Sequence, residues 1–143
     1  MTFEVASSLT YCRAVVKEAL RLRGPGPFLV LEPTEKYTTM SGKEVPTDAS
    51  VFLLLRFAGT QETSFTRGKD FVPERWIDAE CDAALSQEGG EQGKKSAVHT
   101  PEADQSFGHG ARVCPGRELA LLEAVMAVAA IIHAFNVELA PGQ

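Results

Sequence analysis

The sequence feature that most constrains the fold is the stretch FGHGARVCPG, residues 107–116. It places Cys114 in a glycine-rich turn directly before a long apolar segment, residues 117–135, that predicts a helix. Backbone N–H groups and the positive end of the helix dipole stabilise a thiolate at such a position. A thiolate can act as a nucleophile, a redox group or a metal ligand, and a buried structural cysteine is the simplest alternative. The turn alone leaves all of these open.

The spacing of the flanking residues narrows the choice. The pattern Phe-x-x-Gly-x-Arg-x-Cys-x-Gly is filled by Phe107, Gly110, Arg112, Cys114 and Gly116, and it resembles the haem-ligand loop of the cytochrome P450 family. The resemblance implies that Cys114 is the thiolate ligand to haem iron. Phe107 is then expected near the sulfur, and Arg112 offers planar donors suited to a haem propionate. Gly110 and Gly116 are expected to take up positive φ where the backbone approaches the flat macrocycle.

Two further motifs precede this loop. Residues 9–23 predict a helix with one apolar side, which a Gly-Pro-Gly-Pro run ends. This helix contains Glu18-x-x-Arg21, which in isolation indicates an exposed ion pair worth about 0.3–0.5 kcal/mol. The segment FVPERW contains Arg75 and predicts an extended turn at its proline. The family resemblance implies that Glu18, Arg21 and Arg75 form a buried triad, because a lone buried charge is costly.

The residues between these motifs predict a small antiparallel sheet. Residues 28–31 and 51–55 are apolar runs, and we expect the second to be a strand buried on both faces. Residues 37–45 predict a hairpin with Ser41-Gly42 as a two-residue turn, and residues 136–139 offer one more short strand. The pattern predicts a fold that is mainly α with small β-sheets (α+β), resembling the C-terminal part of the cytochrome P450 fold.

The helix expected at residues 117–135 is apolar nearly all round, so it needs cover on every face. Residues 81–105 are polar and glycine-rich, and they predict an irregular, partly mobile meander loop. We expect residues 1–143 to form a single partial domain with five parts. In order these are the Glu-x-x-Arg helix, a small antiparallel sheet, the meander loop, the cysteine loop and the long buried helix. Members of the family are several times longer, so an apolar face should remain uncovered beside Cys114.

Composition argues against several other classes of protein. The net charge of −5 disfavours nucleic-acid binding. Cys12, Cys81 and Cys114 are far apart and suit neither a disulfide framework nor a Cys-x-x-Cys zinc site. The first residues show no signal peptide, and the most apolar helix falls short of the ~20 residues that span a bilayer. Localisation stays open, since full-length relatives can be membrane-anchored or cytoplasmic.

The resemblance implies a monooxygenase that binds haem and inserts one oxygen atom of O2 into an apolar organic substrate. It also implies a redox partner, either a flavoprotein reductase or a ferredoxin, that docks where Arg117, Lys94 and Lys95 can meet an acidic surface. Leu31 stands near the place where many members direct a basic residue to a propionate. The helix that carries groups for oxygen activation has no counterpart here, so catalytic residues stay unassigned. A haem-binding isomerase and a non-catalytic truncated remnant remain alternatives.

Overall fold

Helices lie at both ends of the described chain and short strands lie between them. The structure is a computed structural model, and it describes residues 3–39, 41–77 and 103–142. The elements are α1 (Phe3–Ser8), α2 (Thr10–Arg23), β1 (Leu29–Leu31), β2 (Tyr37–Thr38), β3 (Glu44–Val45), β4 (Val51–Leu53), α3 (Leu55–Gly59), the 3-10 helices η1 (Pro73–Trp76) and η3 (Gly110–Arg112), and α5 (Arg117–Ala134).

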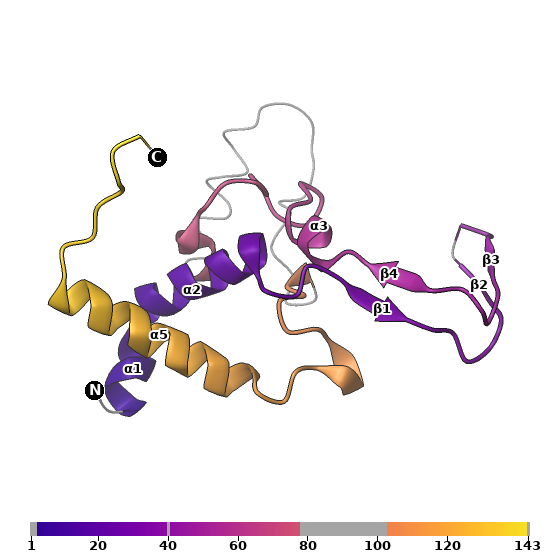
Figure 1. The fold of residues 1–143 in the computed structure, drawn as a ribbon, viewed down its shortest axis with the longest axis horizontal. Helices are drawn as coiled ribbons and strands as arrows, with labels where there is room; N and C mark the ends of the chain where they lie inside the picture. The colour runs from indigo at the N-terminus through magenta and orange to yellow at the C-terminus, as the bar shows by residue number, and fades with distance from the viewer. Residues whose placement is uncertain (1–2, 40, 78–102, 143) are drawn as a thin grey trace.

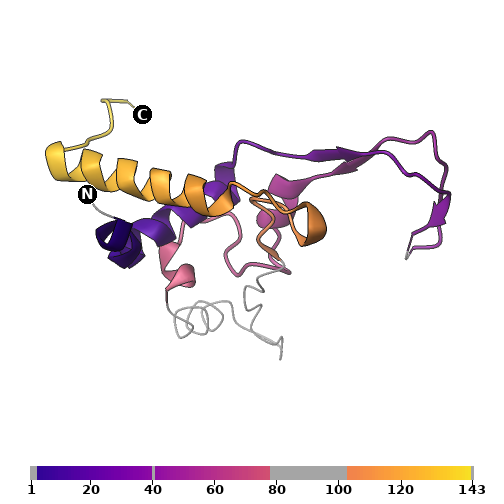
Figure 2. The same cartoon turned by 90° about the horizontal axis from the view of Figure 1, so that it is seen from below.

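The elements form a helical body and a β arm that projects from it (Figure 1). In the body, α5 lies against α1 and α2, and η1 and α3 also pack against α2. Figure 2 shows the arm from below, reaching away from the three helices. Its base is the antiparallel pair β1–β4, with Leu29 opposite Leu53, and its tip is the hairpin β2–β3. The expected fold class, mainly α with small antiparallel sheets, is confirmed.

The core of the body lies between α2 and α5. Val16 of α2 and Leu121 and Val125 of α5 are buried together, and half-buried Leu20 and Phe107 pack against them. The residues of α2 that turn away from this core include Glu18 and Arg21, which are also buried. Helix α2 is therefore covered on two sides, by α5 on one and by η1 on the other.

Helix α5 is covered on one side only. Leu121 and Val125 are its buried residues, whereas Leu119, Ile131 and Ile132 are 61%, 50% and 64% exposed. The sequence predicts a helix that is buried on every face. Among the described residues, packing partners lie on the side of α1 and α2. A long apolar surface of α5 consequently faces solvent.

Three expectations about the strands were wrong. β4 ends at Leu53 and the next helix begins at Leu55, and β4 is not buried on both faces, because Phe52 is 56% exposed. No layer of the described chain covers that pair of strands. The hairpin β2–β3 forms, but its turn is longer than two residues, since the Thr39 amide bonds the Lys43 carbonyl. Residues 136–139 form no strand, since no described segment pairs with them.

The N-terminal helix α1 was not anticipated from the sequence, and it packs on α5. Most of the segment expected to be an irregular loop, residues 81–105, lies outside the described residues, as do Cys81, Lys94 and Lys95. Within the described ranges, no helix is both long enough and apolar enough to cross a bilayer.

Candidate functional site

The three side chains predicted to form a triad meet beneath α2. Arg21 donates from Nε to Glu18 Oε2 at 2.9 Å and from Nη2 to Oε1 at 2.7 Å. Arg75, on η1, donates from Nε to Glu18 Oε1 at 3.1 Å. Glu18 is 0% exposed and both arginines are 3% exposed. The Glu-x-x-Arg pair is therefore a buried network and not a surface ion pair.

Two further donors form hydrogen bonds to the carboxylate of Glu18. The backbone amide of Val72 bonds Oε1 at 2.9 Å, and Trp76 donates from Nε1 to Oε2 at 2.9 Å. Burial alone would raise the pKa of Glu18, but hydrogen bonds from Arg21, Val72 and Trp76 together hold that pKa below its ordinary value. The hydrogen bond from Trp76 to Glu18 was not predicted from the sequence. The available signal was that the N–H of a tryptophan packed into a protein usually finds a hydrogen-bond acceptor.

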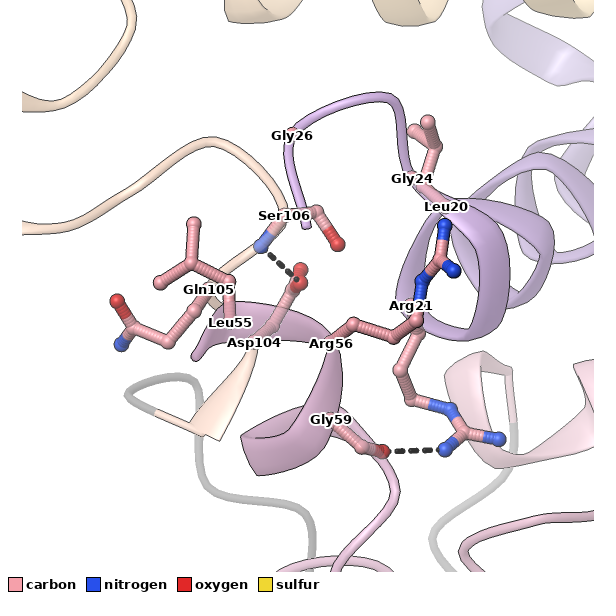
Figure 3. Close-up of a pocket in the computed structure, with 10 residues that line it drawn as sticks. All are labelled: Leu20, Arg21, Gly24, Gly26, Leu55, Arg56, Gly59, Asp104, Gln105 and Ser106. Carbon is pink, nitrogen blue, oxygen red and sulfur yellow. Dashed lines mark hydrogen bonds between the residues drawn. The ribbon is translucent and has the colours of Figure 1, made fainter. Parts of the chain in front are cut away.

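The remaining donors of the two guanidinium groups are satisfied by backbone carbonyls. Arg21 bonds the carbonyls of Gly59, Gly68 and Asp70, and it lies over the Phe65 ring at 5.0 Å. Figure 3 shows the bond to Gly59 at the end of α3. Arg75 bonds the carbonyls of Thr66 and Arg67. The irregular segment 59–76 is thus tied to α2 at many points, and we name Glu18, Arg21 and Arg75 the buried brace.

The chain reaches the cysteine loop by a segment packed against α2 and α3. Asp104, Gln105 and Ser106 face Leu20 and Gly24 at one end of α2 and Leu55 of α3 (Figure 3). The space left between them is about 10 Å³, so this junction is packed and has no room for a ligand. The Asp104 carboxylate accepts from the Ser106 amide at 3.1 Å and fixes the turn into the loop.

The cysteine loop is closed by two backbone hydrogen bonds. Cys114 donates its amide to the Phe107 carbonyl at 2.9 Å, and Val113 donates to Gly110 at 3.1 Å. Gly108 and Gly110 have φ of 73° and 69°, a region that side chains strongly disfavour. The expectation of positive φ is therefore met at Gly110, where a Cβ would project into open space.

Gly116 does not follow that expectation. Its φ is −86°, because it is the N-cap residue of α5, and the position is open to residues with side chains. The ideal Cβ position on Gly116 lies 3.9 Å from Cys114 Sγ, which places the sulfur beside the start of the helix. Phe107 packs against the core between α2 and α5 and so anchors the loop from below.

The exposed groups of this loop fit haem. Cys114 is exposed and its thiol forms no disulfide. Arg112 is also exposed, and no described carboxylate pairs with it. A soft thiolate ligand, a free planar guanidinium and an open glycine backbone suit an iron, a propionate and a flat ring respectively. Leu31 lies on the β arm and is 48% exposed, and its apolar side chain cannot form an ion pair with a propionate.

Basic residues gather between α2 and the start of α5. Arg13 donates to Glu118 at 3.1 Å, and Arg117 Nε is buried with no hydrogen bond, 3.7 Å from the same carboxylate. Lys17 lies 5.0 Å from the centre of the Trp76 ring. Burial, followed by the positive charge of Arg13, lowers the pKa of Lys17. Sequence reasoning selected Arg117 alone from this basic group.

The described residues thus combine a buried brace of one acid and two arginines with an exposed cysteine at the N-terminus of α5. The sequence profile described as Cytochrome P450 matches residues 1–143, and the chain belongs to that family. Haem is the cofactor of the family.

Similar proteins include an enzyme, a fusion protein and a solved structure. The chain is 31% identical to geraniol 8-hydroxylase of Catharanthus roseus over 94% of its own length and 24% of that protein. It is 29% identical to a bifunctional cytochrome P450/NADPH–P450 reductase of Gibberella moniliformis over 95% of its length and 11% of that protein. The retinoic acid-bound cyanobacterial CYP120A1 superposes with a TM-score of 0.76 at 26% identity, over 100% of this chain and 29% of that one. The chain spans less than a third of each.

Proposed function

We propose that this chain is the haem-ligand portion of a cytochrome P450 monooxygenase, with Cys114 as the thiolate ligand. The observation that carries the proposal is the exposed Cys114 thiol, held in a closed loop at the N-terminus of α5. When bound, haem supplies reductive activation of O2, by which one oxygen atom enters an apolar organic substrate. The partial likeness to geraniol 8-hydroxylase supports this reaction class.

Each residue of the loop then has a separate role. Cys114 provides the sulfur from an exposed position just before the start of α5. Arg112 pairs with a carboxylate of the cofactor, because it is exposed and has no described carboxylate partner. Gly110 lets the backbone lie close to the ring. Phe107 fixes the loop to the core, so the sulfur keeps one position.

The buried brace acts at a distance from the reacting atoms. Glu18 has no exposed surface, so it cannot touch a substrate or exchange protons with solvent directly. Its role is to hold residues 59–76 against α2, whose other side forms the floor under Phe107. We therefore expect the buried brace to stabilise the position of α2, and through α2 the position of the cysteine loop.

We assign the redox partner to the face that carries Arg13, Lys17 and Arg117. These cations lie beside the start of α5, and an acidic protein surface would complement them. The reductase fused to the relative from Gibberella moniliformis supports an electron donor of the flavoprotein class, and a ferredoxin is the other class. Lys94 and Lys95 belong to the same proposal.

The test is the absorbance of the reduced, haem-reconstituted chain with carbon monoxide. Cys114→Ser should remove the thiolate signature of the spectrum, since an alcohol oxygen is a far poorer donor to iron. Cys12→Ser and Cys81→Ser should leave it unchanged. A Cys114→Ser protein with the spectrum of the unaltered chain would disprove the ligand assignment.

One observation favours a second candidate, a non-catalytic truncated remnant that holds no stable haem. The apolar side of α5 is exposed among the described residues, and the chain spans under a third of its relatives. On this alternative the isolated chain binds haem weakly and oxidises no substrate when a competent reductase is added. Substrate turnover by a monomeric chain would rule this alternative out.

A further inference from the structure

An open groove lies on the side of the body where α2, β1 and α3 meet. It is lined by apolar side chains, among them Phe28, Leu54, Phe57 and Phe71, and its volume is about 760 Å³. These four side chains are between 47% and 61% exposed. None of the lining residues belongs to the cysteine loop, to α5 or to the buried brace. The groove is therefore a separate feature from the proposed haem site.

The rim of this groove is positively charged, although the chain as a whole carries −5. Arg23 at the end of α2, Arg56 on α3 and Lys69 all line it, and no acidic residue does. All three cations are exposed, and none has a carboxylate partner among the described residues. Figure 3 shows Arg56 reaching from α3 toward the end of α2 that bears Leu20. The nearby acid Asp70 is held by Arg67 at 2.7 Å.

We infer that this groove is a docking site for an acidic amphipathic helix of a partner protein. The apolar floor matches a helical stripe of apolar residues at i, i+3, i+4 and i+7. The three free cations match carboxylates that flank such a stripe, and this charge complementarity selects an acidic helix over a basic one. Exposed phenylalanines in the floor supply the aromatic anchors that carry most binding energy at interfaces.

The shape of the groove favours a helix over a small ligand. Small molecules bind in cavities that bury most of their surface, whereas each anchor here keeps about half of its own surface in solvent. A helix is about 10 Å wide and can cover an open groove while its far side stays in water. The inference does not depend on haem binding, because none of its residues takes part in the cysteine loop.

The test uses two labelled synthetic helices of about five turns, with the same Leu/Phe stripe and flanks of Glu in one and Lys in the other. Fluorescence anisotropy is recorded as the 143-residue chain is titrated into each peptide. The Glu peptide should bind at least about tenfold more tightly than the Lys peptide, and its affinity should fall as salt is raised. Equal affinity for both peptides would overturn the inference, because it would indicate unspecific apolar adhesion.

Variants locate the binding on the chain. Arg23→Glu combined with Arg56→Glu should weaken the Glu peptide at least about tenfold, and Phe57→Ser should weaken both peptides. Lys69→Gln is a milder change that should weaken the Glu peptide about two- to fivefold. The matched controls are Lys43→Glu, which reverses an exposed charge on the arm, and Ile132→Ser, which removes an exposed apolar side chain from α5. An equal loss with Lys43→Glu would assign the effect to net charge and overturn the site.

Two other occupants have their own readouts. Vesicles of anionic lipid should not compete with the Glu peptide, and effective competition would reassign the groove to a membrane surface. Sedimentation should show that Arg23→Glu combined with Arg56→Glu leaves self-association unchanged. A loss of self-association in that variant would reassign the groove to a second copy of the chain.

Discussion

Arg21 and Arg112 carry the same guanidinium group in opposite surroundings. Arg21 is 3% exposed and bonds both oxygens of Glu18 and the carbonyls of Gly59, Gly68 and Asp70. Arg112 is exposed beside an exposed Cys114 and has no described carboxylate partner. The described residues satisfy the buried brace, whereas they offer Arg112 no carboxylate partner and leave Cys114 exposed.

The difference follows from which surfaces each region buries. The brace is enclosed by α2, η1 and the segment 59–72, all supplied by residues within the described chain. The cysteine loop is supported through Phe107, which packs against the core that contains Leu121, while Arg112 and Cys114 in the same loop are exposed. The described residues can thus satisfy every charge of a buried network while they leave the groups of the cysteine loop exposed.

The largest decrease in the free energy of unfolding is expected from Glu18→Ala. Removing this carboxylate leaves Arg21 and Arg75 buried without an anion, and breaking a buried pair in this way costs about 3–5 kcal/mol. Urea unfolding followed by far-UV circular dichroism measures the loss. Glu123→Gln, an exposed change on α5, is the control and should alter stability by less than about 0.5 kcal/mol. Equal losses in the two variants would break the contrast between the brace and the surface.

Local patterns predicted the parts of the molecule whose partners lie close in sequence or carry opposite charge. Helix α2 begins one residue after its predicted start and ends at Arg23 as predicted. The convergence of Glu18, Arg21 and Arg75 was implied by the family resemblance, and it is consistent with the cost of burying any of these charges alone. The five donors around Glu18 could not be predicted in full, because the Val72 amide and Trp76 depend on how the chain turns at Pro73.

Burial was predicted less well than secondary structure. An unbroken apolar run at residues 51–55 is typical of a strand covered on both faces, yet β4 is mostly exposed and the run passes into α3 at Leu55. Residues 136–139 have a strand-like sequence, and no described strand pairs with them. In both cases the apolar sequence predicts a partner surface, and the described residues do not supply one.

Acid should weaken the buried brace. The pKa of Glu18 in the folded chain lies below its ordinary value of about 4.3, so the carboxylate is more stable folded than unfolded. Its contribution is therefore fully present above about pH 4.3 and is lost as pH falls through the lower folded pKa. Unfolding free energies of the native chain and of Glu18→Gln, measured from pH 6 downward to about pH 2, should converge at the acid end. Parallel curves would show that Glu18 does not carry this dependence.

The smallest effect on stability is expected from Ile132→Gln, which also tests whether the apolar side of α5 is exposed in solution. Ile132 is 64% exposed on α5, so it contributes little to folding, and the change should move the unfolding free energy by about 0.5 kcal/mol or less. The same side chain belongs to an exposed apolar surface. Removing such a surface from water is favourable by about 25 cal/mol for each Å² buried, so contact between copies of the chain is favourable. Sedimentation should accordingly show less self-association for Ile132→Gln than for the unaltered chain, while Glu123→Gln on the same helix leaves association unchanged. If Ile132→Gln instead destabilised the fold as much as Glu18→Ala, α5 would be covered in solution and the two regions would not differ as the structure shows.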